Sequence, residues 1–248
     1  MRPLIAVAGV CAFAGALVIA AMAAAPRATD TAAAAATSMP YVTADPAVIS
    51  RVDPAGAYGR VQPDDRVDRT VRFVSGLLIP IEGASVPTDP ELLPNSARAY
   101  RGGFHEGLDF PADEGTPVHA VAAGTIVRID RDFTDWSSED RDRALAEAVA
   151  LGYTPSSTLD RIRGQQVWID HGRQIVSRYA HLSAVADLAV GAKVAAGDVV
   201  GFVGSSGLPE GGPHLHLEIR LGTSYLGDGQ DGDALIAAIG AAFAPRSP

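Results

Sequence analysis

The chain has 248 residues, of which 47% are hydrophobic, and its 29 acidic and 20 basic side chains give a net charge of −9. Charges of both signs are interspersed along the chain, which excludes nucleic acid as an expected partner. The single cysteine, Cys11, lies in an apolar N-terminal run. The rest of the chain therefore has no disulfide, thiol nucleophile or cysteine ligand, and a metal there must be held by His, Asp or Glu.

The first 25 residues differ in composition from the rest. Arg2 precedes an unbroken apolar run, and small residues at Ala21-Met22-Ala23 are typical of a cleavage site. Segment 1–25 is therefore expected to be a secretory signal peptide, or an uncleaved N-terminal membrane anchor, which is the only membrane contact expected. Either alternative predicts an exported protein that is extracellular, periplasmic or anchored at the cell surface.

Residues 26–69 are rich in Ala, Thr, Pro and Asp without a sustained apolar period, which predicts a flexible linker. A folded domain is expected over 70–228, entered by a strand that includes Val71, Leu77 and Ile79. Short apolar runs separated by Gly and Pro then predict an antiparallel β-sheet domain rather than βαβ units. The further strands are expected at residues 104–110, 118–122, 124–129, 166–170, 175–180, 199–203 and 214–220. Residues 191–201 resemble the turn-and-strand hairpins of lipoyl-like β domains, with their glycines at turn positions.

One segment, 131–164, breaks the β pattern and predicts a helical insertion between two strands. Ser137 has capping-box spacing before an apolar helical face that lasts until Gly152. A shorter helix is expected over 157–163. The insertion either packs on the domain in a purely structural role or acts as a lid that controls substrate access. The C-terminal tail, 229–248, is expected to contain a short helix.

Two histidines, His214 and His216, lie in an alternating run that reads as a strand. Side chains two residues apart on a strand leave the same face, so the histidines point one way while Leu215 and Leu217 point to the core. Two imidazoles at a strand end either bind one metal together or divide metal binding and proton transfer between them.

A second cluster, His105 and Asp109, also shares one face by its even spacing on an extended segment. Both are competent zinc ligands, and one further imidazole would complete a three-ligand site with the fourth position open to water. Glu106 lies at an odd spacing from His105 and Asp109, so its side chain does not share their face, and it is expected to be exposed. The core-directed face is expected to hold Phe104, Leu108 and Phe110.

Three further histidines lie outside these pairs. His181, in Tyr179-Ala180-His181-Leu182, is a third candidate. We expect His119 to be an ordinary strand side chain and His171, before Gly172, to belong to a turn.

Together, His105 with Asp109, the segment around His181, and Pro213-His214-Leu215-His216 resemble the lysostaphin/LytM-type zinc metallopeptidases, which cleave peptide bonds in peptidoglycan. The resemblance covers residues 73–226 and includes the segments around the motifs, such as Ala123-Gly124-Thr125-Ile126-Val127. It implies a mainly β, LytM-like peptidase domain with one zinc ion.

The resemblance also implies site residues, position by position. The zinc ligands fall on His105, Asp109 and His216, and the two non-ligand active-site histidines fall on His181 and His214. Tyr100 is a further candidate donor to the transition state, although its alignment is loose. The insertion departs from the minimal family domain and leaves substrate preference open.

The chemistry expected of such a site agrees with these residues. Zinc polarises a carbonyl and lowers the pKa of bound water to about 7. The chain has no HExxH motif and therefore lacks the glutamate base of that protease class. An imidazole is the natural replacement, with one of His181 and His214 orienting the water and the other stabilising the oxyanion.

The sequence thus predicts a zinc metalloendopeptidase acting on peptidoglycan. One alternative is a catalytically silent LytM-like domain that binds or activates another cell-wall hydrolase. A second alternative, suggested by residues 191–204, is a non-enzymatic β-hairpin adaptor. This alternative assigns no function to the histidines and Asp109.

Overall fold

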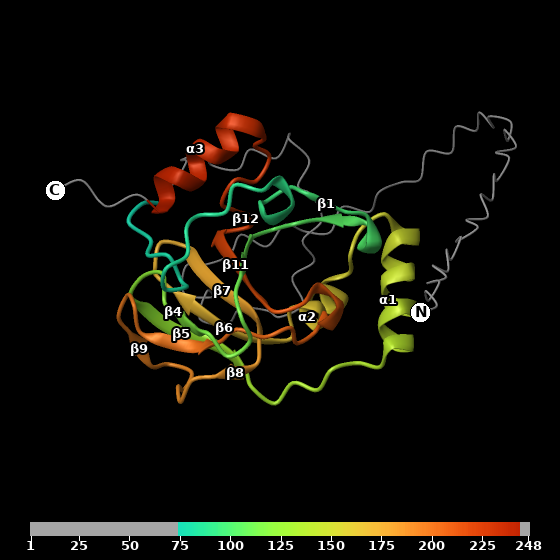
Figure 1. Cartoon of the computed structure of the whole chain (residues 1–248), viewed down its shortest axis with the longest axis horizontal. Coiled ribbons are helices and arrows are strands. Elements are labelled where there is room, and N and C mark those ends of the chain that lie inside the picture. The colour runs from blue at the N-terminus through green and yellow to red at the C-terminus, as the bar shows by residue number, and fades with distance from the viewer. Residues whose placement is uncertain (1–73, 244–248) are drawn as a thin grey trace, which may run out of the picture. The chain divides into compact units, whose positions relative to one another are not determined.

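The computed structural model describes residues 74–243. These residues form a mainly antiparallel β structure with three α-helices, so the predicted fold class is confirmed (Figure 1). No helix in this range is long and apolar enough to cross a membrane. The signal or anchor expected at 1–25 and the linker expected at 26–69 lie outside the described residues, as do 70–73 and 244–248.

The largest sheet contains β11 (His214–Leu221), the strand that carries His214 and His216. This strand pairs antiparallel with β3 (Leu108–Pro111), β7 (Ile175–Leu182) and β12 (Ser224–Tyr225). Beyond β7 the sheet continues through β6 (Gln165–Asp170), β5 (Gly124–Asp130) and β9 (Lys193–Val194).

Two smaller sheets accompany it. One has the order β4 (Pro117–His119), β10 (Val199–Phe202) and β8 (Ala184–Val185). The other pairs β1 (Ala97–Arg98) with β2 (Gly103–Phe104) around the 3₁₀ turn η3 (Ala99–Arg101). Two more 3₁₀ turns are η2 (Pro90–Leu92) and η4 (Pro209–Gly211).

Several expected strands differ from the observed ones. Residues 74–79 form no strand. Two backbone hydrogen bonds hold the segment instead: the Leu77 N–H donates to the Ala242 carbonyl at 3.0 Å, and the Leu78 N–H donates to the Val121 carbonyl at 2.8 Å. The strand expected over 104–110 is interrupted between β2 and β3. Residues 191–201 do not form a two-stranded hairpin, because β9 pairs with β5 whereas β10 belongs to the three-stranded sheet.

The break between β2 and β3 changes the predicted core face. Leu108 and Phe110 are buried as expected, but Phe104 is 40% exposed and its core assignment is wrong. Alternation holds only within one continuous strand, and β2 ends at Phe104.

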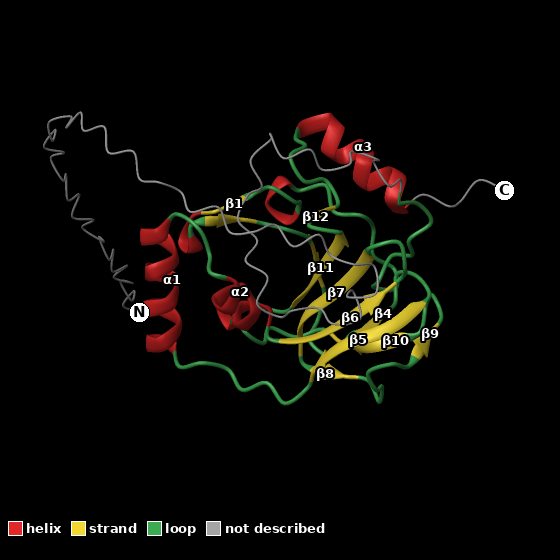
Figure 2. Cartoon of the chain, turned by 180° about the vertical axis from the view of Figure 1, so that it is seen from behind, coloured by secondary structure: helices red, strands yellow, loops and turns green. Residues whose placement is uncertain are grey.

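The expected helices are present. Helix α1 (Ser138–Leu151) begins where Ser137 accepts a hydrogen bond from the Asp140 N–H and ends at Gly152 in a left-handed conformation. Helix α2 (Ser156–Arg163) follows, and both views show it between α1 and the strands (Figures 1 and 2). Helix α3 (Gly232–Phe243) lies away from both.

The two faces of β11 have different roles. Leu215, Leu217 and Ile219 are buried in the hydrophobic core. The opposite face presents the side chains of alternate residues, beginning with His214 and His216. Burial of one face therefore fixes which side chains the other face offers for chemistry.

Candidate metal centre

Strand pairing brings the two halves of the predicted site together. His216 on β11 lies directly opposite Asp109 on β3 in the antiparallel register. His105 lies in the short segment between β2 and β3. All three residues are buried, with exposed fractions of 2% for His105, 8% for Asp109 and 9% for His216.

The three side chains converge on one point. His105 Nε2 lies 3.0 Å from Asp109 Oδ1 and 3.0 Å from His216 Nδ1, and His216 Nδ1 lies 2.9 Å from Asp109 Oδ1. They form the one group of three metal-ligating residue types with this convergence among residues 74–243. Two imidazole nitrogens and one carboxylate oxygen match the donor set of catalytic zinc sites. The residues present therefore fit a zinc ion.

The remaining polar atoms of these side chains set their orientation. His105 Nδ1 donates to the Leu93 carbonyl at 2.9 Å, which leaves the lone pair of Nε2 facing the centre. His216 Nε2 lies 3.3 Å from Glu218 Oε1, which leaves Nδ1 facing the centre. Asp109 Oδ2 accepts from Arg98 Nη2 at 3.3 Å.

Burial and hydrogen bonds shift the pKa values of these groups. Burial alone would raise the pKa of Asp109, but hydrogen bonds to His105 and His216 hold it well below its usual range. Burial lowers the pKa of His105. Burial also acts to lower the pKa of His216, but hydrogen bonds to Asp109 and Glu218 outweigh it and raise the pKa. Asp109 is thus a fixed negative charge at a site suited to a cation.

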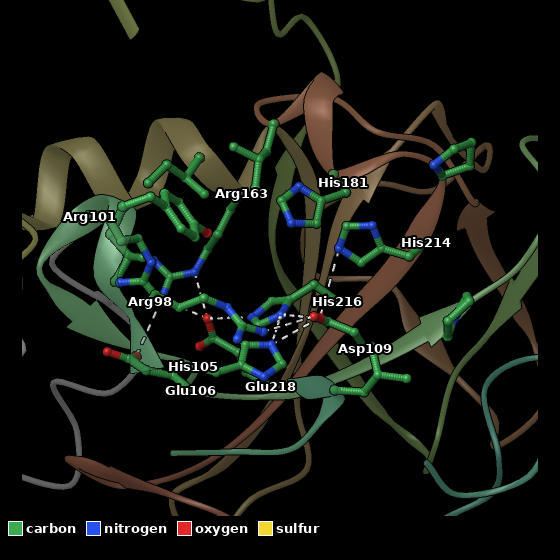
Figure 3. A pocket seen from close by; sticks show the side chains of 18 residues that line it. Arg98, Arg101, His105, Glu106, Asp109, Arg163, His181, His214, His216 and Glu218 are labelled. Carbon is green, nitrogen blue, oxygen red and sulfur yellow. Dashed lines mark hydrogen bonds and ion pairs between the residues drawn. The ribbon is translucent and has the colours of Figure 1, made fainter. Parts of the chain in front are cut away.

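His181 and His214 lie side by side next to this centre (Figure 3), with ring centroids 4.7 Å apart. His214 Nε2 is 3.8 Å from Asp109 Oδ1. His181 has a left-handed backbone with φ of 61°, rare for a residue with a side chain and often found at functional sites. Burial, reinforced by His214 and His216, lowers the pKa of His181 to about 3, so its ring is neutral at pH 7.

All five predicted site residues line one cavity of about 290 Å³. Tyr100 lines the same cavity and is 44% exposed. His119 and His171 do not line it. His119 Nδ1 bonds to the Gly197 carbonyl at 2.8 Å, and His171 Nε2 lies 2.8 Å from Ser177 Oγ, which agrees with a strand and a turn role.

Sequence reasoning missed the charged residues behind the centre. Glu106, expected to be exposed, has a side chain only 14% exposed that lies 2.7 Å from Arg220 Nη1. The expected exposure of Glu106 is wrong. Strand alternation considers one strand alone, whereas arginines from β11 and α2 approach Glu106 from other elements. Glu218 is 1% exposed and accepts from Arg163 Nε at 2.7 Å.

A signal for part of this cluster was present in the sequence. Glu218 and Arg220 lie at even spacings from His214 and His216 along β11, so strand alternation places all four side chains on the same face. Burial would raise the pKa of Glu218, but Arg163, Arg178 and Arg220 hold it well below its usual range. Glu218 is therefore an ionised carboxylate held by cations behind His216.

Comparison with known proteins shows a similarity to one peptidase family. Residues 142–228 match the model of peptidase family M23. Over these residues the chain resembles peptidase family M23. The matched range includes His181, His214 and His216 and begins after His105 and Asp109.

Two of the relatives are named as peptidases. The chain is 35% identical over 118 residues to the DD-carboxypeptidase/endopeptidase Mpg of Neisseria meningitidis, a match that covers 48% of this chain and 20% of that protein. It is 30% identical over 115 residues to the peptidoglycan DD-endopeptidase ShyA of Vibrio cholerae, covering 46% of this chain and 20% of that protein. The chain thus spans about a fifth of the length of these relatives.

A solved structure described as a putative M23 peptidase from Pseudomonas aeruginosa is 27% identical in sequence. The match covers 69% of this chain and 56% of that chain, with a TM-score of 0.41.

Proposed function

We propose that this chain is an exported zinc-dependent endopeptidase that hydrolyses peptide bonds of bacterial peptidoglycan, within a stem peptide or a cross-bridge. The observation that carries the proposal is the convergence of His105 Nε2, Asp109 Oδ1 and His216 Nδ1, with separations of 2.9–3.0 Å, in a cavity shared with His181 and His214. The peptidoglycan DD-endopeptidase activity named for the relative ShyA supports the substrate class. The apolar segment 1–25 supports export, because peptidoglycan lies outside the cytoplasmic membrane.

In this proposal His105, Asp109 and His216 hold a single zinc ion. When bound, zinc supplies a Lewis acid that polarises the scissile carbonyl and lowers the pKa of water. Leu93 and Glu218 keep the two imidazoles in the tautomers that ligation needs.

His181 and His214 provide the proton-transfer groups. His181 Nδ1 donates to the Ser206 carbonyl at 2.9 Å, and His214 Nδ1 donates to the Gly212 carbonyl at 2.8 Å. A carbonyl oxygen only accepts, so each Nδ1 carries the hydrogen and each Nε2 keeps its lone pair. These Nε2 atoms are placed to accept a proton from an attacking water and to return it to the departing amine.

The test is digestion of isolated peptidoglycan by the purified, zinc-loaded chain, with the released fragments identified by mass spectrometry. We expect cleaved peptides, one zinc per chain, and loss of both zinc and cleavage in His105→Ala. The matched control His119→Ala, outside the cavity, is expected to keep both.

The outcomes separate the alternatives. Stoichiometric zinc without any cleaved fragment would replace this proposal by the silent domain that binds or activates another hydrolase. Cleavage that survives in His105→Ala would refute the zinc assignment.

A further inference from the structure

The wall of the cavity next to the metal centre is rich in arginine. Arg98, Arg101 and Arg163 line the cavity, and Arg178 and Arg220 lie directly behind Glu218. The carboxylates in this group are Glu106, Glu218 and Asp109. Asp109 is assigned to the metal, and Arg98 also faces Glu91 at 3.7 Å. The other four arginines face two glutamates, Glu106 and Glu218. Arginines therefore outnumber carboxylates in this cluster, apart from any zinc ion.

Arg101 is the arginine in this wall that lacks a carboxylate partner. It is 6% exposed, and its guanidinium donates to Thr154 Oγ1 at 2.9 Å and to the Phe104 carbonyl at 2.5 Å, both neutral acceptors. Within residues 74–243 it forms no ion pair with a carboxylate. Burial lowers the pKa of Arg101 and outweighs the opposing effects of Tyr100 and Glu106, while the positive charge of Arg163 adds slightly to the lowering. Because this buried cation has no carboxylate within ion-pair distance, a bound anion would stabilise it.

Arg163 extends the same wall. Its Nε donates to Glu218 Oε1 at 2.7 Å, while Nη2 lies 2.7 Å from the same oxygen without a hydrogen bond of its own. Figure 3 shows Arg101 and Arg163 on the side of the cavity away from His214. Leu159 and Ile162 of α2 line the cavity beside them, so the wall offers positive charge next to apolar surface.

The helical segment 131–164 builds this wall. Arg163 is the last residue of α2, and Thr154, between α1 and α2, both accepts from Arg101 Nη1 and donates to the Arg101 carbonyl. Gly103 permits the close approach, because a Cβ there would lie 2.7 Å from Arg101 Nη1 and 2.9 Å from Thr154 Oγ1. The segment thus supplies one arginine and fixes the other.

We propose that Arg101 and Arg163 form a subsite that binds a carboxylate of the peptide substrate beside the metal centre. The inference rests on the proposed peptidase function and names what the helical segment recognises. Guanidinium groups match carboxylates in shape and charge. The carboxylate comes either from the C-terminus of a peptide or from an acidic side chain.

The test uses three peptides of otherwise identical sequence. One carries a free C-terminal carboxylate, one carries a side-chain carboxylate with an amidated C-terminus, and one has both groups amidated. For each, kcat/KM and Kd are measured with the zinc-loaded full chain. We expect one of the two acids to be preferred over the fully amidated peptide by about 10- to 100-fold in both quantities, and the preferred acid identifies the source.

Variants assign the preference to the subsite. In Arg101→Met the acid-to-amide ratio is expected to fall to about one, and in Arg101→Lys to an intermediate value, because lysine keeps the charge but not the fork. Arg143→Met, which removes an exposed charge from α1, is the matched control and keeps the wild-type ratio. Thermal unfolding shows whether Arg101→Met is folded; if it is not, Arg101→Lys decides.

Failure of this inference differs from failure of the proposed function. If the wild type cleaves peptidoglycan but treats acid and amide peptides alike, the subsite is refuted and the peptidase remains. If no peptide is cleaved, the function fails, and Kd alone decides the subsite: equal affinities refute it, whereas an acid preference lost in Arg101→Met upholds it. If Arg101→Lys keeps the acid-to-amide ratio of the wild type, the planar guanidinium group of Arg101 is not needed for the preference, and that role is refuted.

Discussion

His216 contacts two carboxylates through its two ring nitrogens: Nδ1 lies 2.9 Å from Asp109, and Nε2 lies 3.3 Å from Glu218. Glu218 follows His216 by two residues on the same face of β11. It is held in turn by Arg163, whose Nε donates at 2.7 Å, and by Arg178, whose Nη1 donates at 3.2 Å. Glu218 therefore links the candidate metal centre, through His216, to the buried arginines.

Neutralising Glu218 should destabilise the fold. In Glu218→Gln the shape is kept, but buried arginines lose their counterion, and loss of one partner of a buried ion pair costs about 3–5 kcal/mol. Denaturant unfolding of the metal-free chain measures this change. Glu147→Gln on the exposed side of α1 should change the free energy of unfolding by no more than about 0.5 kcal/mol. Equal stability of the two variants would mean that the cluster does not depend on Glu218.

Removing either non-ligand histidine should separate catalysis from metal binding. We expect His181→Ala and His214→Ala to keep one zinc per chain while kcat falls by about 10²- to 10⁴-fold, the usual contribution of a proton-transfer group. Zinc content by mass spectrometry and kcat on a peptide substrate are measured on the same preparations. His119→Ala, on β4 and outside the cavity, serves as the control. Loss of zinc from His181→Ala would instead make His181 part of the metal centre.

Local patterns predicted those features that depend on one continuous element. Alternation along β11 correctly placed Leu215 and Leu217 in the core, with His216 on the other face. Capping residues at Ser137 and Gly152 correctly bounded α1. Parity also associated His105 with Asp109, although His105 lies in a break before β3 and reaches the centre through its bond to the Leu93 carbonyl rather than by strand alternation.

Such local patterns could not predict which arginines are buried. Arginine is exposed by default, and its burial requires carboxylates from distant parts of the chain. Arg163 and Glu218 are separated by 55 residues, and Arg220 and Glu106 by 114 residues. Only the pairing of β11 with β3 and β7, together with the placement of α2, brings these groups together.

Gly164, at the end of α2, should not tolerate a side chain. Its φ is 65°, and a Cβ would lie 2.3 Å from the Ser206 carbonyl oxygen, which also accepts from His181 Nδ1. Gly164→Ala should therefore destabilise the fold by about 2–5 kcal/mol, from backbone strain and overpacking, and reduce kcat by displacing His181. Gly172→Ala is the matched control, since its φ is 77° but no atom lies within 4 Å of the added Cβ. It should cost only about 1–2 kcal/mol. Equal losses in denaturant unfolding would contradict the predicted clash.

Tyr179 should make stability depend on pH in the alkaline range. Its ring is fully buried, its hydroxyl accepts from the Val121 N–H at 2.8 Å, and burial raises its pKa from 10.0 to about 12. The unfolded chain therefore loses this proton first as the pH rises, and the stabilisation present below pH 10 is lost between pH 10 and 12. Two pKa units correspond to about 2–3 kcal/mol in the free energy of unfolding.

Denaturant unfolding at several pH values measures this loss. Other groups also titrate in this range, so the quantity to compare is the difference between the wild type and Tyr179→Phe. Tyr179→Phe should be less stable at pH 8, because the hydroxyl bond to Val121 is lost, and this deficit should shrink as the pH approaches 12. Tyr153→Phe, at a residue 51% exposed, should follow the wild-type curve throughout. A deficit of Tyr179→Phe that stayed constant from pH 8 to 12 would show that the Tyr179 phenol titrates alike in the folded and unfolded chains.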